Sequence, residues 1–166
     1  MTMKKTIFVL GAGNGCGNRV AEKFGKNDFR VVLMARNAEH LAAYEAEFKE
    51  KGIEVYTKVA DASKPYSVTK AFDELKAQSQ KNGAILVTGG GLSLYPMYEY
   101  LPLSMDKAAL RAMCLALHEE LKKQNVYLGT VTVTDVIAPG GKCGPALLAE
   151  DFWKLYTERK DCEVVH

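Results

Sequence analysis

The sequence predicts a doubly wound α/β fold, in which a parallel β-sheet is covered by helices on both faces to give three layers. Three observations predict it. Short, continuously apolar segments alternate along the chain with segments whose apolar residues recur at helical spacing. Glycine, asparagine or proline follows many of these segments. No repeat, low-complexity linker or change of composition divides the chain, so we expect one domain, residues 1–166, with right-handed crossovers.

The predicted strands are apolar runs, as expected of strands that are covered on both faces. They are 6–10, 30–35, 53–60, 84–88 and 127–136. The predicted helices have apolar residues along one stripe. They are 16–25, stopped by Gly25; 38–51, ended by Gly52; a helix capped by Ser67 and ended by Asn82-Gly83; a long helix opened by Ser104; and 146–156.

Composition and charge exclude several classes of protein. The 166 residues include 22 basic and 20 acidic side chains, a formal net charge of +2 that is too small to indicate a nucleic-acid surface. No apolar run approaches the roughly 18 residues of a membrane span. The cysteines form no CxxC pair, and His40, His118 and His166 have no metal-ligand companions. We expect a cytoplasmic protein with reduced thiols, no metal, and no nucleic-acid or membrane partner.

The most informative segment is the glycine-rich loop GAGNGCG between the first strand and the first helix. Its spacing is GxxxGxG rather than GxGxxG, because a cysteine stands where the last glycine of that motif would be. Glycines allow a tight turn and leave the N-terminus of a helix open to a phosphate group. The loop therefore predicts a Rossmann-type dinucleotide site. Its candidate cofactor-binding residues are Gly11, Gly13, Asn14, Gly15, Cys16 and Gly17. A merely tight turn is the alternative interpretation.

The ends of the second and third strands indicate which cofactor would bind. The second strand ends in Met34-Ala35-Arg36-Asn37, without the carboxylate that would hold the ribose 2′-hydroxyl of NAD. An arginine there suits the 2′-phosphate of NADP, so Arg36 and Asn37 favour NADP, with NAD possible. Asp61 and Ala62 follow the third strand, where a carboxylate can bind the adenine amino group. A solvated Arg36, and Asp61 as a helix cap, are the alternatives.

Together these residues resemble the short-chain dehydrogenase/reductase (SDR) family over nearly the whole chain. The resemblance is carried by GAGNGCG (11–17), MARN (34–37), VADAS (59–63), GAILVTGGG (83–91), SMDKAALRAMCLALHEEL (104–121) and IAPGG (137–141). The chain is most similar to a divergent branch that has TGGG at the end of a strand and a Trp-x-x-Tyr helix near the C-terminus. The resemblance implies a Rossmann fold, a nicotinamide cofactor and hydride transfer between a carbonyl compound and an alcohol.

The family's catalytic residues carry over only in part. The family uses a Tyr-x-x-x-Lys pair and an upstream serine, and its lysine also binds the nicotinamide ribose. Lys107 matches that lysine, but Leu103 stands at the tyrosine position and Gly90 at the serine position. Tyr100 is the better replacement for the acid among the nearby tyrosines, and Ser93 and Ser104 are also near. Lys107, which matches the family, and Tyr100, as a replacement for its tyrosine, are therefore the candidate catalytic residues, and the resemblance implies Lys107, Pro139 and Gly140 as cofactor contacts. A surface lysine and a tyrosine that packs a loop are the alternatives for Lys107 and Tyr100.

The length of the chain is short for that family. A strand and a helix that the family has are not recognisable between Val59 and Ala84. The resemblance implies a homo-oligomer, and a substrate site near the last helix, where Phe152, Trp153 and Tyr156 favour a small hydrophobic carbonyl compound. Two alternatives to an NAD(P)-dependent oxidoreductase stay open. One is a dinucleotide-binding pseudoenzyme or redox sensor, and the other is a structural domain with an empty glycine loop.

Overall fold

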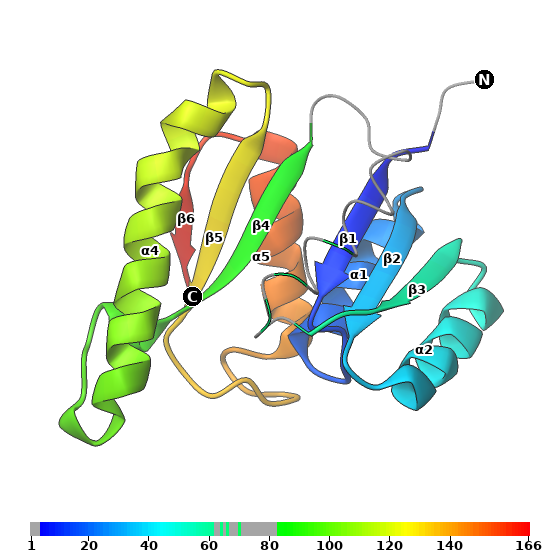
Figure 1. Ribbon diagram of the computed structural model, residues 1–166, viewed down its shortest axis with the longest axis horizontal. Coiled ribbons are helices and arrows are strands. Elements are labelled where there is room, and N and C mark those ends of the chain that lie inside the picture. The colour runs from blue at the N-terminus through cyan, green and yellow to red at the C-terminus, as the bar shows by residue number, and fades with distance from the viewer. Residues whose placement is uncertain (1–3, 62–63, 65, 67–69, 71–82) are drawn as a thin grey trace. The chain divides into compact units, whose positions relative to one another are not determined.

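The computed structural model describes residues 4–61, 64, 66, 70 and 83–166. These form two compact units, residues 1–80 and 81–166, and each is described by itself. The helix expected after Ser67, and Ala62, lie outside the described residues. Each unit contains a three-stranded parallel sheet with helices packed against it (Figure 1). The α/β class is therefore confirmed, and the single-domain organisation stays a prediction.

The first unit is a β-α-β-α-β arrangement. Strands β1 (Thr6–Leu10), β2 (Arg30–Ala35) and β3 (Val55–Val59) lie in the order β1-β2-β3, and α1 (Cys16–Lys26) and α2 (Ala38–Glu50) connect them. The two faces of β2 are both buried. Val31 and Leu33 pack in a core with residues of both helices, while Val32 and Met34 are fully buried on the other face. The continuous apolar run of β2 follows from this double coverage.

The sequence predicts that Gly25 ends the first helix, but α1 continues to Lys26. A Cβ atom at Gly25 would lie 2.5 Å from Cγ2 of Ile53. The glycine thus serves the close packing of α1 against the segment before β3 rather than a helix stop. The third strand also begins later than expected, at Val55, and Ile53 is instead a buried core residue.

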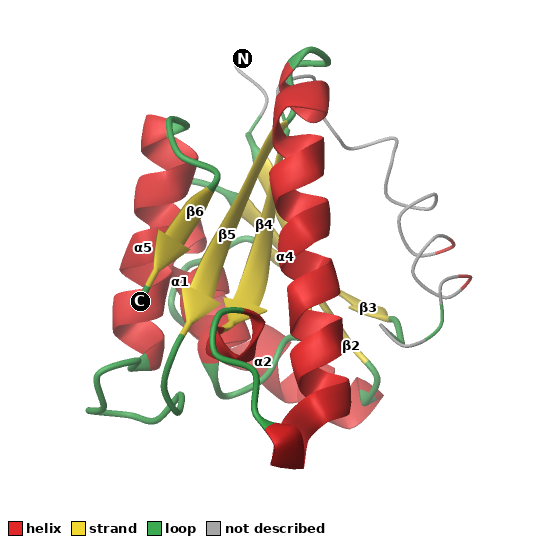
Figure 2. Ribbon diagram, turned by 90° about the vertical axis from the view of Figure 1, so that its left-hand side faces the viewer, coloured by secondary structure: helices red, strands yellow, loops and turns green. Residues whose placement is uncertain are grey.

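The second unit has strands β4 (Ala84–Gly90), β5 (Tyr127–Val133) and β6 (Glu163–Val165), in the order β4-β5-β6. Helices α4 (Leu101–Lys122) and α5 (Pro145–Glu158) lie on opposite faces of this sheet (Figure 2). All seven residues of the central strand β5 are buried, as expected between two helical layers. The three predicted layers are therefore present within this unit.

Polar side chains fasten α4 to its sheet. Nδ1 of the buried His118 lies 2.6 Å from the Leu128 carbonyl oxygen of β5. Arg111 donates to both carboxylate oxygens of Glu163 on β6, with its closest contact at 2.6 Å, and Thr132 of β5 donates to Glu163 as well. The hydrogen bond from Arg111 holds the pKa of Glu163 below its ordinary value. The contacts of His118 and Arg111 fix the helix to the central strand β5 and to the edge strand β6.

Three boundaries in this unit differ from the sequence prediction. Helix α4 begins at Leu101 rather than at Ser104, since Pro102 fits the first helical turn, where no N–H donor is needed. Strand β5 ends at Val133 instead of continuing to 136, and β4 continues to Gly90. Strand β6 is not predicted, because three residues are too few to show a period of two.

Across the described residues, no helix is both long enough and apolar enough to cross a bilayer. The same residues contain no group of three or more histidine, cysteine or acidic side chains placed to hold a metal ion. The four cysteines are all free thiols.

Candidate functional site

The loop between β1 and α1 is held by its backbone. Gly11 has a φ of +89°, which favours glycine, and its N–H donates to the Met34 carbonyl oxygen at 2.8 Å. The N–H of Ala12 donates to the same oxygen at 3.0 Å. The N–H of Gly13 donates to Oδ1 of Asn18 at 2.9 Å, so the first turn of α1 closes the loop. Asn18 is a loop-forming residue that the sequence reading overlooked.

The N-terminus of α1 is open to a ligand. Gly15, at the N-cap, makes no side-chain capping bond, and the first turn contains no acidic residue. A Cβ at Gly11, Gly13 or Gly15 would meet no atom within 4 Å. A Cβ at Gly17, by contrast, would lie 2.7 Å from the Gly11 carbonyl oxygen, so Gly17 is required for packing the helix on the loop. Uncapped N–H groups and free space in front of them suit a phosphate group.

Cys16, predicted as a cofactor contact, is the first residue of α1. Burial raises the pKa of its thiol to about 11. The side chain is therefore neutral near neutral pH and supplies neither a nucleophile nor a negative charge that would repel a phosphate.

The other predicted contacts of this unit lie at the same sheet edge as the loop. Parallel register aligns Leu10 with Met34 and Ala35 with Val59, so the chain leaves all three strands at one edge. Arg36 is exposed there, directly after β2. Asn37 caps α2 through a 3.0 Å bond from the His40 N–H, which gives its side chain a structural role.

Asp61 follows β3 at this edge and is half-buried. Its main-chain oxygen accepts from the Lys64 N–H at 3.0 Å, and its carboxylate lies 3.8 Å from the Lys64 ammonium. The main chain therefore turns at Asp61, and the helix that Asp61 would cap in the alternative interpretation lies outside the described residues. The structure brings the glycine loop, Arg36 and Asp61 to one edge.

In the second unit, Lys107 and Gly90 are neighbours. A Cβ at Gly90 would lie 3.1–3.3 Å from the Cδ, Cε and Cγ atoms of Lys107. The methylene chain of Lys107 thus fills the space of a side chain at position 90. Lys107 and Gly90, which stand at the lysine and serine positions of the family that the chain resembles, thus meet at the end of β4. The Lys107 side chain lies where a serine side chain at position 90 would begin.

Tyr100 lies at the N-cap of α4, and its side chain is exposed to 55% of its maximum. It is seven residues before Lys107, so both lie on one side of the helix, two turns apart. Ser104 lies between them, buried, and donates to the Tyr100 carbonyl oxygen at 2.9 Å while accepting from the Met97 N–H at 3.3 Å. Both bonds occupy its hydroxyl, which makes Ser104 a positioning residue.

Ser93 ends a short helical turn, Gly91–Ser93, that follows β4. Its hydroxyl oxygen is buried and has no hydrogen-bond partner among the described residues. An unsatisfied buried hydroxyl is costly, and such groups often mark functional sites. The glycines before it are required by β5: a Cβ at Gly89 would lie 2.7 Å from the Thr132 hydroxyl, and one at Gly91 would lie 2.8 Å from Cα of Thr134.

Pro139 and Gly140 lie in the loop that follows β5, residues 134–144. Gly140 has a φ of +76°, and turns within the loop are closed by N–H groups of Gly141 and Gly144 at 3.1 Å. Because Val133 of β5 is in register with Gly90, this loop and Lys107 lie at the same edge of the second sheet.

Phe152, predicted to line a substrate site, is only 3% exposed and belongs to the core instead. Phe152 is buried because it lies on the side of α5 that packs against the sheet.

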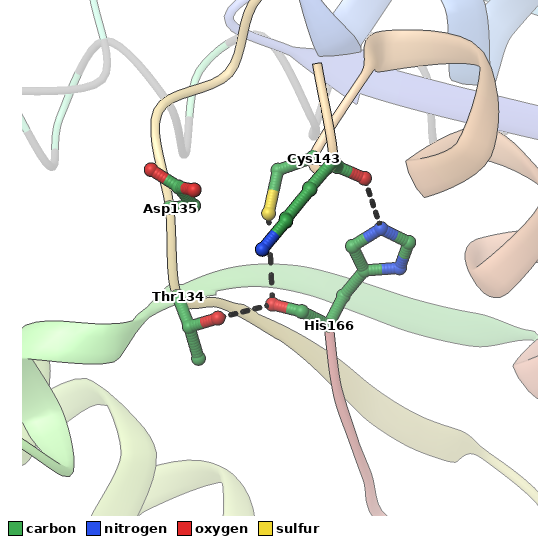
Figure 3. Close-up of a pocket in the computed structure, with 5 residues that line it drawn as sticks. Thr134, Asp135, Cys143 and His166 are labelled. Carbon is green, nitrogen blue, oxygen red and sulfur yellow. Dashed lines mark hydrogen bonds between the residues drawn. The ribbon is translucent and has the colours of Figure 1, made fainter.

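A hollow of about 410 Å³ adjoins this loop, lined by Thr134, Asp135, Lys142, Cys143 and His166. Figure 3 shows the His166 main-chain oxygen between Thr134 and Cys143. It accepts from the Thr134 hydroxyl at 2.7 Å and from the Cys143 thiol at 3.6 Å. The sequence does not indicate the partners of the His166 ring, because Lys142 and Asp151 are distant from it along the chain.

Sequence comparison matches the first half of the chain. Residues 5–81 match the family model described as short chain dehydrogenase. A diacetyl reductase, (S)-acetoin forming, of Staphylococcus epidermidis is 39% identical over 62 residues. That match covers 37% of this chain and 24% of the reductase, so it spans about a quarter of the length of that relative.

Structural comparison extends over both units. A short-chain dehydrogenase from Rhodopseudomonas palustris has a TM-score of 0.86 at 20% identity, covering 98% of this chain and 97% of that one. An NADPH-bound short chain oxidoreductase from Pseudomonas aeruginosa PAO1, described as containing an atypical catalytic center, has a TM-score of 0.85 at 13% identity and covers 97% and 95% of the two chains. The fold is thus the Rossmann-like fold of these enzymes. Residues 5–81 are thus similar in sequence to the short chain dehydrogenase family, and both units share the fold of its solved structures.

Proposed function

We propose that this protein is an NAD(P)-dependent oxidoreductase that interconverts a small carbonyl compound and its alcohol, with NADP as the preferred cofactor. The observation that carries the proposal is the open N-terminus of α1 behind the glycine loop, where three glycines face free space. The match of residues 5–81 to the short chain dehydrogenase family model supports the reaction type.

The first unit would hold the cofactor. The N–H groups at the start of α1 suit its pyrophosphate, and Asp61 suits its adenine. Arg36 supports the NADP preference, because it is exposed beside the loop and the end of β2 has no competing acid. The residues present therefore fit a dinucleotide. When bound, the cofactor supplies or accepts the hydride.

The second unit would supply the proton. Lys107 lies on α4 two turns after Tyr100, which stands at the N-cap, and the side chains of a helix lean toward its N-terminus. In the reducing direction, the Tyr100 hydroxyl gives its proton to the carbonyl oxygen, and the Lys107 ammonium stabilises the resulting phenolate. Pro139 and Gly140 would contact the cofactor from the loop after β5.

The proposed substrate is a small, hydrophobic carbonyl compound, and a diketone is the first to test because the matched relatives are diacetyl reductases. NADPH oxidation is followed with diacetyl and with a panel of aldehydes and ketones. Lys107→Ala and Tyr100→Phe are each expected to lower kcat at least 100-fold, the range for loss of an acid–base group. Lys122→Ala, an exposed lysine on the same helix, is the control. Full turnover in both variants would remove these two residues from the mechanism.

Cofactor preference is tested separately by calorimetry. Arg36→Ala should weaken NADPH binding about tenfold or more and leave NADH binding nearly unchanged, because only NADPH carries the 2′-phosphate. Lys49→Ala, an exposed lysine of the same unit paired with Glu45, is the control. Equal losses for both cofactors would contradict the assignment of Arg36.

A second candidate is a dinucleotide-binding protein without turnover. Leu103 and Gly90 stand at the positions of the family's acid and hydroxyl, and Lys107 fills the space at position 90. This candidate predicts NADPH binding by calorimetry with no oxidation of NADPH by any carbonyl compound in the panel. The first turnover observed that depends on Lys107 would exclude it.

A further inference from the structure

His166 makes hydrogen bonds with both ring nitrogens, and both partners are acceptors. Nε2 lies 2.8 Å from the carbonyl oxygen of Lys142, and Nδ1 contacts the carboxylate of Asp151 on α5. A carbonyl oxygen accepts only, and an ionised carboxylate accepts only. A neutral imidazole donates from one nitrogen only. Its other nitrogen would then place a lone pair against the lone pair of an acceptor oxygen. With Asp151 ionised, the doubly protonated ring is the form that satisfies both contacts.

The contacts of His166 join three parts of the second unit. Its main-chain N–H donates to Thr132 of β5 at 2.9 Å, and its main-chain oxygen accepts from the N–H of Thr134 at 2.9 Å. Its ring reaches Lys142 in the 134–144 loop and Asp151 on α5. Figure 3 shows the ring between the loop and the strand end, with Cys143 beside it. The ring thus adds two side-chain contacts to the main-chain bonds that hold the loop to the strand end, and it is the part of this junction that can change its charge.

We propose that His166 is a positioning residue that works in its doubly protonated form: it ties the 134–144 loop to β6 and α5, and the loop loosens when His166 releases a proton. This inference rests on the proposed function for its consequence, since Pro139 and Gly140 of this loop are proposed cofactor contacts. Cofactor affinity would then fall as the histidine deprotonates. The loop motion itself needs no cofactor.

The electrostatic surroundings agree with this geometry. The titratable and charged groups that surround the ring are Asp151 from α5, Asp135 and Lys142 from the loop, and the Cys143 thiol. The hydrogen bond to the Lys142 carbonyl, followed by that to Asp151, raises the pKa of His166 above its ordinary value of 6.5 and outweighs desolvation. Because the pKa is raised on folding, the tie is complete below the ordinary value and is lost as pH rises through the raised value.

The experiment uses the protein without cofactor. NMR follows the ring protons of the three histidines from about pH 5.5 to about pH 9, a range that spans the ordinary histidine pKa. Hydrogen exchange of the Gly141 and Gly144 amides, corrected for the intrinsic pH dependence of exchange, reports the loop, because both amides close turns in it. We expect their protection to fall about tenfold as His166 deprotonates, as for the loss of one charge-assisted hydrogen bond.

Two variants and a control separate the tie from general stability. His166→Gln should remove the pH step in the protection of both amides. Asp151→Asn should shift the step and the ring titration to lower pH, and it serves if His166→Gln does not fold. His40→Gln, on the exposed side of α2, should match the wild type. A His166 ring that titrates at or below 6.5 in the wild type, or a pH step that persists in His166→Gln, would overturn the proposal.

NADPH affinity measured over the same pH range tests the consequence for function. A fall in affinity that follows the His166 titration supports the link. An unchanged affinity, with the loop still responding, would refute only the role of the loop in cofactor binding. Absence of NADPH binding at any pH would refute the proposed function and leave the exchange result unaffected.

Discussion

Replacing Gly17 by alanine separates the packing of the glycine loop from its contacts with a ligand. The added Cβ would lie 2.7 Å from the Gly11 carbonyl oxygen and 3.4 Å from Cα of Ala12. Both atoms belong to the backbone and cannot rotate away, so α1 must shift from the loop. Overpacking of this kind costs about 2–3 kcal/mol, and alanine in a helix recovers about 0.5–1 kcal/mol relative to glycine.

The expected net loss of stability is therefore about 1–2.5 kcal/mol, which corresponds to a fall in Tm of roughly 2–10 °C for a chain of this length. Urea unfolding followed by circular dichroism measures it. Gly13→Ala is the matched control, because its Cβ meets no atom within 4 Å and its stability should be unchanged or slightly higher. The Gly13 methyl group nevertheless enters the space proposed for the pyrophosphate, so NADPH binding should weaken about tenfold. A Gly17→Ala protein as stable as the wild type would refute the packing argument.

Three further predictions concern titratable groups. Since burial raises the pKa of Cys16 to about 11, its alkylation by iodoacetamide near pH 8 should be about 100-fold slower than that of a thiol with the ordinary value, as measured by peptide mass spectrometry. The hydrogen bond from Lys26, with a second from Lys51, lowers the pKa of Glu22 to about 2. Its stabilising effect is thus present above the ordinary carboxyl value and lost as pH falls toward 2. Glu22→Gln should cost about 1 kcal/mol near neutral pH, because the two lysines are solvent-screened, and almost nothing near pH 2 in urea unfolding. Glu163→Gln should likewise cost about 1 kcal/mol near neutral pH, with the difference from wild type shrinking as pH falls below the ordinary carboxyl value, because its pKa is lowered too.

Local patterns predicted much of the fold. The apolar run of β2 indicated a strand covered on both faces, and both faces are buried. The spacing of apolar residues predicted α2 to within one residue of its end. The glycine loop was predicted at the correct strand–helix junction, and Gly17 is needed there for packing. Each of these depends on neighbours in sequence, which a single sequence displays directly.

Features that depend on distant contacts were not predicted. Gly25 reads as a helix stop, but its reason is Ile53, 28 positions further along the chain. The contact between Lys107 and Gly90 depends on the packing of α4 against β4, and the partners of His166 come from a loop and from α5. A pattern in one sequence shows the residue type but not the partner across a fold.

In the proposed mechanism, Tyr100 would replace a tyrosine that stands four residues before the lysine in the family that the chain resembles. Each residue of an α-helix adds about 1.5 Å of rise, so a position seven residues before Lys107 is about one turn farther than the position of Leu103, and on the same side. Tyr100 stands at that position, and the bonds of Ser104 to the Tyr100 carbonyl and to the Met97 N–H hold it at the start of the helix. Because the Lys107 side chain packs over Gly90, a serine at position 90 would require that side chain to move by a few tenths of an ångström. If Tyr100 and Lys107 act together as proposed, introducing the residues of the resembled family one at a time, as Leu103→Tyr or Gly90→Ser, should not improve turnover of NADPH with the carbonyl panel, and a higher kcat in either variant would contradict the proposed pair.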